Sequence, residues 1–218
     1  WTEPAMTHLP SWRKNLQRHS GFWRDGYWYD LHLERRMPLA LEMIDEMVLA
    51  LPPLREGTRV CDLACGTGNA AAAVVSAYPL VHLTLIDRDP DLLAIAYDKV
   101  ADYCPDAVTI QATIVPDGEP LPGGPYDVVL ASLALHVLVG HDSERSDPAE
   151  VETRYELLLQ GIRDTLTPGG HLIIGDHVGV LPLYRHLKAL ERTGFIDVDC
   201  AWRVDDFFVI GGRVPDTP

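Results

Sequence analysis

Two carboxylates flank a turn of small residues in a pattern that suits an adenosine-bearing cofactor. Residues 60–69 read Val-Cys-Asp-Leu-Ala-Cys-Gly-Thr-Gly-Asn, so a strand-like stretch containing Asp62 passes into a glycine-rich turn. Small residues let the backbone approach a ligand closely, and the helix that follows offers free N–H groups. Asp87 ends the next apolar stretch, where an acidic side chain can accept the hydrogens of both ribose hydroxyls.

The same turn also fits a dinucleotide-binding pattern. Residues 66–71 match G-x-G-x-x-A, with Asp87 as the acidic partner. Three features argue against this interpretation. Asp62 would repel a pyrophosphate, too little chain follows for a separate substrate domain, and the last two strands form an apparent hairpin. An NAD(P)-dependent oxidoreductase remains the alternative enzyme class.

Two histidines follow predicted strands and are the candidate catalytic residues. His136 lies four positions after Ser132, and His177 follows Asp176. Ligands of open α/β sheets bind beyond the carboxyl ends of the strands, and an imidazole there can take a proton from a hydroxyl or an ammonium. The alternative is that each histidine is structural and bonded to backbone. Asp142, Asp176 and His177 could also offer metal ligands, but they match no metal motif, so we expect no metal.

Strands and helices alternate along most of the chain. The predicted strands are residues 58–63, 80–87, 108–112, 126–132, 171–176, 196–202 and 207–213. The predicted helices are residues 33–51, 69–77, 90–102, 148–166 and 182–192. Such alternation predicts an α/β fold with a doubly wound, seven-stranded, mostly parallel sheet and a C-terminal antiparallel hairpin.

The N-terminal 32 residues differ in composition from the rest. Four of the five tryptophans lie there, together with Tyr27 and Tyr29. We predict that residues 1–32 form an aromatic cap or lid and that residues 33–218 form a single globular domain. The alternative is that these aromatic side chains pack the first helix onto the sheet.

Composition limits the class of protein and its partners. The 218 residues are 47% apolar and 23% charged, and the formal net charge is −14. That charge disfavours nucleic acids and anionic membranes as partners. We expect no membrane-spanning segment, because no apolar run reaches about 20 residues. Four cysteines without a CxxC pair indicate a reducing cytoplasm, and we expect a monomer or a homodimer.

Several motifs in order resemble the class I S-adenosylmethionine (SAM)-dependent methyltransferases. Residues 62–68 resemble the acidic-x-Gly-x-Gly-x-Gly signature, residues 85–87 the second motif, residues 126–132 the fourth-strand motif, and residues 166–174 the turn into the fifth strand. The resemblance covers about residues 40–213. It implies a Rossmann-like fold, SAM as cofactor with S-adenosyl-L-homocysteine as product, and methyl transfer to oxygen or nitrogen of a small molecule. A non-catalytic SAM-binding partner or regulatory protein is the remaining alternative.

The resemblance also implies roles for individual residues. Asp62 would contact the methionine ammonium of SAM, directly or through water. Gly66 and Gly68 would let the backbone pack against the methionine and ribose, Asp87 would hold the ribose hydroxyls, and Arg88 would lie near the adenine. The other expected cofactor contacts are Tyr29, Ala64, Cys65, Thr67, Thr113, Ile114, Ala131 and Ser132.

The chain departs from the family pattern at two points. Ala64 replaces the first glycine of the signature, and its small side chain is expected to change little. After the third strand no acidic residue appears until Asp117, so we expect Thr113 or backbone groups to contact the adenine amino group.

Overall fold

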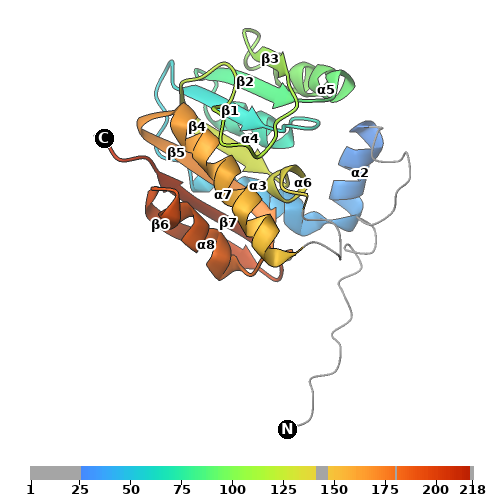
Figure 1. Cartoon of the computed structure of the whole chain (residues 1–218). Helices are drawn as coiled ribbons and strands as arrows, with labels where there is room; N and C mark the ends of the chain where they lie inside the picture. The colour runs from blue at the N-terminus through green and yellow to red at the C-terminus, as the bar shows by residue number, and fades with distance from the viewer. Residues whose placement is uncertain (1–25, 141–146, 180, 217–218) are drawn as a thin grey trace.

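The computed structural model describes residues 26–140, 147–179 and 181–216, which form a seven-stranded sheet covered by helices (Figure 1). The strands are β1 (Arg59–Leu63), β2 (His82–Asp87), β3 (Val108–Gln111), β4 (Tyr126–Ser132), β5 (Leu166–His177), β6 (Ile196–Val204) and β7 (Phe207–Arg213). Their order is β3-β2-β1-β4-β5-β7-β6. The first five strands run parallel, and β7 pairs antiparallel with both β5 and β6. The predicted fold class is therefore confirmed.

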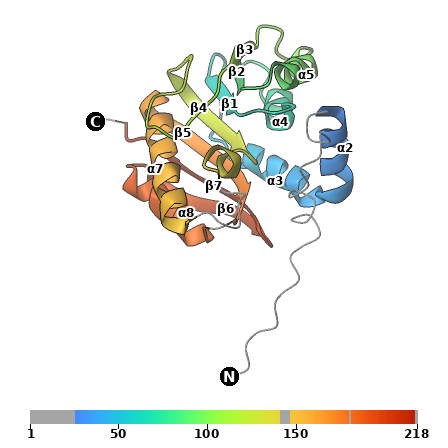
Figure 2. The same cartoon turned by 45° about the vertical axis from the view of Figure 1, so that its right-hand side comes forward.

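Helices cover both faces of the sheet (Figures 1 and 2). They are α2 (Gly26–Arg36), α3 (Pro38–Leu49), α4 (Asn69–Ala77), α5 (Pro90–Val100), α6 (Leu135–Leu138), α7 (Pro148–Thr165) and α8 (Leu183–Arg192). Apolar side chains of α3, α4 and α5 form one buried cluster, and those of α6, α7 and α8 contribute to a second. Along β1, Val60 belongs to the first cluster and Cys61 to the second. Burial on both faces explains why the central strands are almost continuously apolar.

The predicted helix over residues 33–51 is wrong in its extent. The structure has two helices there, with α2 ending at Arg36 and α3 beginning at Pro38. Proline has no N–H group and disfavours helical backbone at the residue before it, and Met37 has φ −134°. The apolar repeat continues across the break because both helices contribute to one core, through Leu33 on α2 and Met43 on α3.

Two further elements differ from the prediction. Strand β5 begins at Leu166 rather than His171, because Tyr126 of β4 already pairs with Leu166 ahead of the register shift. The short helix α6 lies within an apolar run in which no helix was predicted. It places His136 among buried residues.

The predicted cap falls largely outside the described residues. Residues 1–25 are not described, and α2 continues without interruption across positions 32 and 33. The division into a cap of residues 1–32 and a domain of residues 33–218 therefore stays a prediction. Among the described helices, none is long and apolar enough to cross a membrane.

The order of the strands determines where a ligand can bind. From β1 the chain adds β2 and β3 on one side of the sheet, and β4 and β5 on the other. At such a reversal the connections leave in opposite directions, which opens a crevice beyond the carboxyl ends of the strands. The turn after β1 and the segment after β4 both begin at this crevice.

Candidate functional site

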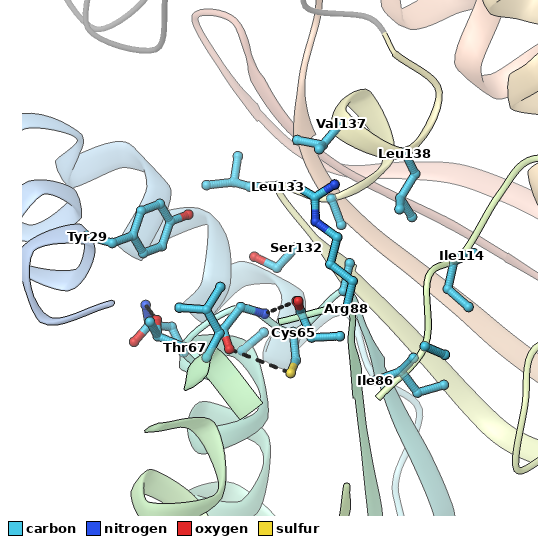
Figure 3. Close-up of a pocket in the computed structure, with 18 of the residues that line it drawn as sticks. Tyr29, Cys65, Thr67, Ile86, Arg88, Ile114, Ser132, Leu133, Val137 and Leu138 are labelled. Atoms are coloured by element: carbon cyan, nitrogen blue, oxygen red, sulfur yellow. Dashed lines mark hydrogen bonds between the residues drawn. The ribbon is translucent and has the colours of Figure 1, made fainter. Parts of the chain in front are cut away.

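A cavity of about 310 Å³ lies beyond the carboxyl ends of β1, β2 and β4 (Figure 3). It is lined by the turn after β1, the ends of β2 and β4, the segment after β3, and side chains of α2, α3, α5 and α6. The lining residues are Tyr29, Leu33, Ile44, Ala64, Cys65, Gly66, Thr67, Asn69, Ala70, Ile86, Asp87, Arg88, Leu92, Ala112, Thr113, Ile114, Ser132, Leu133, Ala134, Val137 and Leu138. The cavity thus occupies the crevice at the reversal of strand order.

The glycine turn places backbone next to the cavity. Ala64, Gly66 and Gly68 all have positive φ, at 51°, 53° and 76°. A side-chain carbon added at Gly66 would meet nothing within 4 Å, so this glycine leaves open space on the cavity wall. At Gly68 the same carbon would lie 2.8 Å from Cβ of Ala96. Gly68 is therefore needed for the packing of α4 on α5, and it does not line the cavity.

Asp87 is held in place by two backbone amides. Gly66 donates its N–H to Oδ2 at 2.9 Å, and Asp89 donates to Oδ1 at 3.0 Å. The side chain lines the cavity and is 8% exposed. Each carboxylate oxygen can accept more than one hydrogen bond, so Asp87 retains acceptor capacity toward the cavity.

Asp62 lies beneath the turn rather than on the cavity wall. It is 1% exposed, and Oδ2 accepts the N–H of Ala71 at 3.0 Å. Its other oxygen, Oδ1, is buried without a hydrogen-bond partner in the described part of the chain. Burial raises the pKa of Asp62 to about 7, against the lowering effect of the Ala71 amide, and the charge of Asp87 raises it further. A buried carboxyl with one oxygen unpartnered is suited to a cationic group or to a bridging water.

A polar network fastens α2 to the glycine turn and to α5. Asp30 Oδ1 accepts hydrogen bonds from Thr67 Oγ1 at 2.6 Å and Asn69 Nδ2 at 2.9 Å. Lys99 Nζ donates to Asp30 Oδ2 and to Asn69 Oδ1, both at 2.7 Å. The sequence analysis did not identify Asp30. Its partners lie far along the chain, so no local motif could have indicated the contact.

Two helices line the cavity across from the glycine turn. Figure 3 shows Tyr29 reaching toward the cavity from α2, and Val137 and Leu138 of α6 completing that wall. Burial raises the pKa of the Tyr29 hydroxyl well above its usual value, and Asp30 and Asp176 add to that effect. Tyr29 is therefore neutral at physiological pH, and its hydroxyl can donate a hydrogen bond.

The two candidate histidines meet Asp176, away from the cavity wall. His136 Nδ1 lies 2.7 Å from Asp176 Oδ1, and the backbone amides of His136 and His177 donate to Oδ2 at 3.2 Å and to Oδ1 at 2.8 Å. The two imidazole rings have centroids 4.3 Å apart. Burial by itself would raise the pKa of Asp176, but the charge and hydrogen bond of His136 hold it well below its usual range. Neither histidine lines the cavity, although the next two residues of α6 do.

Most of the predicted cofactor residues do gather at the cavity. The predicted residues that line it are Tyr29, Ala64, Cys65, Gly66, Thr67, Asp87, Arg88, Thr113, Ile114 and Ser132. The predicted residues that do not line it are Asp62, Gly68, Ala131, His136 and His177.

Sequence reasoning missed about half of the wall. The missed lining residues are Leu33, Ile44, Asn69, Ala70, Ile86, Leu92, Ala112, Leu133, Ala134, Val137 and Leu138. Ile86 and Ala112 adjoin residues that were predicted, and the strand-end signal at Ser132 could have been extended to Leu133 and Ala134. The apolar residues of α2, α3 and α6 carry no signal that separates a cavity wall from a core.

Known proteins resemble this chain in the same region. A family model described as a methyltransferase domain matches residues 61–172, just over half of the chain. Trans-aconitate 2-methyltransferase of Paracidovorax citrulli is 30% identical over 127 residues, which cover 58% of this chain and 42% of that protein. Ribosomal RNA small subunit methyltransferase H of Leifsonia xyli subsp. xyli is 35% identical over 75 residues, 34% of this chain and 22% of that protein.

A solved structure described as PigF with SAH has the same fold. It superposes with a TM-score of 0.61 at 18% identity, over 88% of this chain and 60% of that one. The chain spans less than half the length of either curated relative named above. The family match begins in β1, includes the glycine turn and Asp87, and ends in β5. The resemblance inferred from the motifs is thus confirmed, and the chain belongs to the methyltransferase domain family.

Proposed function

We propose that the protein transfers the methyl group of SAM to an oxygen or nitrogen atom of a small-molecule acceptor. The observation that carries this proposal is a single cavity with a glycine turn and Asp87 on one side and an apolar helical wall on the other. SAM supplies a methyl group on a positively charged sulfur. The protein then has to place an acceptor atom in line with that methyl group and keep water out, and positioning of this kind can supply much of the rate.

The residues around the turn suit each part of SAM. Asp87 would accept hydrogen bonds from the ribose hydroxyls with its remaining lone pairs. The unpartnered Oδ1 of Asp62 would receive the methionine ammonium, through a water because Asp62 lies behind the wall. Arg88 and Thr113 lie on the wall at the ends of β2 and β3, where the adenine would bind.

The charges around the turn distinguish SAM from a dinucleotide. Asp62 is buried beneath the turn with one unpartnered oxygen, close to where a dinucleotide would bring its pyrophosphate, whereas Asp87 would accept ribose hydroxyls from either cofactor. A SAM molecule brings an ammonium and a sulfonium, whereas a pyrophosphate brings two negative charges. Repulsion at short range in a partly buried site is costly, which supports SAM over NAD(P).

The far wall supports an acceptor with an apolar body. Leu33, Ile44, Val137 and Leu138 line the cavity there, and Arg88 is the only Lys or Arg among the described lining residues. A tricarboxylate would leave its charges unpaired against such a wall. The net charge of −14 also disfavours RNA. An aromatic or aliphatic alcohol or amine fits this wall better, in a cytoplasmic setting that the four free cysteines support.

We assign His136 and His177 to the acceptor side of the cavity. His136 would affect acceptor binding indirectly, because it belongs to α6 and the next two residues of that helix line the cavity. The stronger prediction, that one of the histidines removes a proton from the acceptor, requires an imidazole to reach the cavity and stays a prediction.

Isothermal titration of one preparation with SAM, S-adenosyl-L-homocysteine and NADPH tests the cofactor. We expect micromolar binding of the first two and none of the third, and the opposite result would overturn the proposal. Methyl transfer from radiolabelled SAM to panels of phenols, alcohols, amines, carboxylic acids and RNA then tests the acceptor. SAM binding without transfer to any panel would favour the non-catalytic alternative.

A further inference from the structure

Helix α6 and the end of β5 bring two imidazoles and one carboxylate together. His136, Asp176 and His177 each offer a metal-ligating atom, and these atoms all lie within 4.8 Å of one another. The three residues are 7%, 2% and 6% exposed. His136 comes from a different element than the other two, so the fold rather than the local sequence creates the cluster.

The cluster contains a buried negative charge with few counter-charges. In the described part of the chain, the ion-pair partner of Asp176 is His136, and no Lys or Arg forms an ion pair with it. A buried carboxylate is costly unless a cation or several hydrogen bonds compensate it. Two backbone N–H groups, those of His136 and His177, donate hydrogen bonds to Asp176, and a divalent ion would add a counter-charge that the described Lys and Arg residues do not supply.

We propose that His136, Asp176 and His177 bind one divalent first-row transition-metal ion. Two imidazole nitrogens and one carboxylate oxygen form a donor set that suits Zn²⁺, Fe²⁺ or Co²⁺, whereas Mg²⁺ and Ca²⁺ favour oxygen ligands. Three protein ligands leave at least one coordination position open for water or another ligand. The sequence alone predicts no metal, because the third ligand comes from α6, about 40 residues before the adjacent Asp-His pair.

The ion would connect two elements that lie behind the cavity wall, α6 and the end of β5. His136 belongs to α6, which places Val137 and Leu138 on the wall, and Asp176 and His177 end β5. A metal bridge would therefore fix the position of α6 relative to the sheet. This proposal does not depend on the identity of the cofactor.

Metal binding by tag-free protein, freed of metal with a chelator, tests the proposal. Zn²⁺ is titrated calorimetrically, and Co²⁺ is followed by its visible absorption, into the wild type and the variants His177→Gln and Asp176→Asn. The matched control is His82→Gln, because His82 is exposed on β2 and outside the cluster. We expect one ion per chain in the wild type and the control, and binding weaker by more than about 100-fold in the cluster variants.

Folding is checked by circular dichroism before each titration. If one cluster variant fails to fold, His136→Gln replaces it, and the visible spectrum of Co²⁺ in the wild type reports its coordination independently. Absence of stoichiometric binding to the wild type would overturn the proposal. So would equal binding by all variants, because the ion would then bind elsewhere. These outcomes are independent of methyl transfer.

Discussion

The two sides of the cavity are built by different means. On one side, the glycine turn and Asp87 follow parallel strands whose pairing aligns Leu63 with Ile86 and fixes where both strands end. On the other side, α2 and α6 reach the cavity as helices held by side-chain contacts, which include the buried Leu33 and Leu135 and the hydrogen bonds of Asp30 and Asp176. The first side is determined by backbone hydrogen bonds and the second by individual side chains. We infer that the first side can keep one cofactor while the second changes with the acceptor.

Asp87→Ala tests the strand side and should have the largest effect. The substitution removes the acceptor for the Gly66 amide and the expected ribose contact. Hydrogen bonds to charged groups are worth about 1.5–3 kcal/mol each, so SAM affinity should fall about 100-fold in calorimetry. The control, Asp98→Ala, removes the same charge from the exposed face of α5. Equal affinity for SAM in the two variants would show that Asp87 does not contact the cofactor.

Asp62→Asn, also on the strand side, should have opposite effects on two quantities: the affinity for SAM and the free energy of unfolding. The folded-state pKa of Asp62 is raised to about 7, so the native state holds a proton that the unfolded state releases from about pH 4 upward. The wild type therefore loses stability as the pH rises toward 7, and the variant does not. At pH 8 the variant should be more stable by up to about 4 kcal/mol, or about 8–16 °C in Tm.

The measurement is thermal unfolding of both proteins at pH 5 and pH 8. The difference in Tm should be clearly smaller at pH 5 than at pH 8, because the wild type loses stability progressively between the unfolded-state pKa near 4 and the folded-state pKa of about 7. The variant should also bind SAM more weakly, since it lacks the charge. A difference in Tm that is equal at both pH values would contradict the assigned burial effect.

Asp30→Ala tests the helical side. The variant loses the hydrogen bonds to Thr67 and Asn69 and the ion pair with Lys99. We expect SAM affinity to fall about tenfold, since one charged network of about 1.5 kcal/mol is lost. Amide hydrogen exchange in α2 should accelerate. Glu34→Ala, at an exposed position on the same helix, is the control, and unchanged exchange in Asp30→Ala would show that α2 is held by its apolar contacts.

Val137→Ala should have the smallest effect and the most selective one. Val137 lines the cavity and is 50% exposed, so the substitution should leave the core intact. We expect KM for the acceptor to rise about threefold, in line with the loss of partly buried methyl groups, while the Kd for SAM stays the same. Leu49→Ala, 76% exposed on α3, serves as control. A change in SAM affinity would mean that the two sides are not independent.

The sequence predicted the strand side well for a physical reason. Strand β1, its glycine turn and the end of β2 form a local sequence pattern. The apolar residues of the buried strands, the small residues of the turn and the acidic residue at the strand end can each be recognised in the sequence. The positive φ at Gly66 is a backbone requirement that only a few residue types satisfy readily. Local requirements of this kind can be read without knowing the fold.

The helical side could not be predicted from the same evidence. Asp30 meets Lys99, and His136 meets Asp176, across 69 and 40 residues of chain. A single polar residue on a helix gives no sign of such a distant partner. The break at Pro38 was missed because the apolar repeat runs across it. Contacts that depend on the assembled sheet appear only when its order and register are known.

The ion pair between Lys99 and Asp30 makes ligand exchange at the cavity sensitive to dissolved salt. Tyr29 and Leu33 of α2 line the cavity, and this ion pair helps to hold α2 against α5. We infer that separation of α2 from Lys99 would ease the exchange of a ligand bound in this cavity. Both partners are partly exposed, so dissolved salt screens their attraction. Dissociation of a ligand from the cavity should therefore become faster as ionic strength rises.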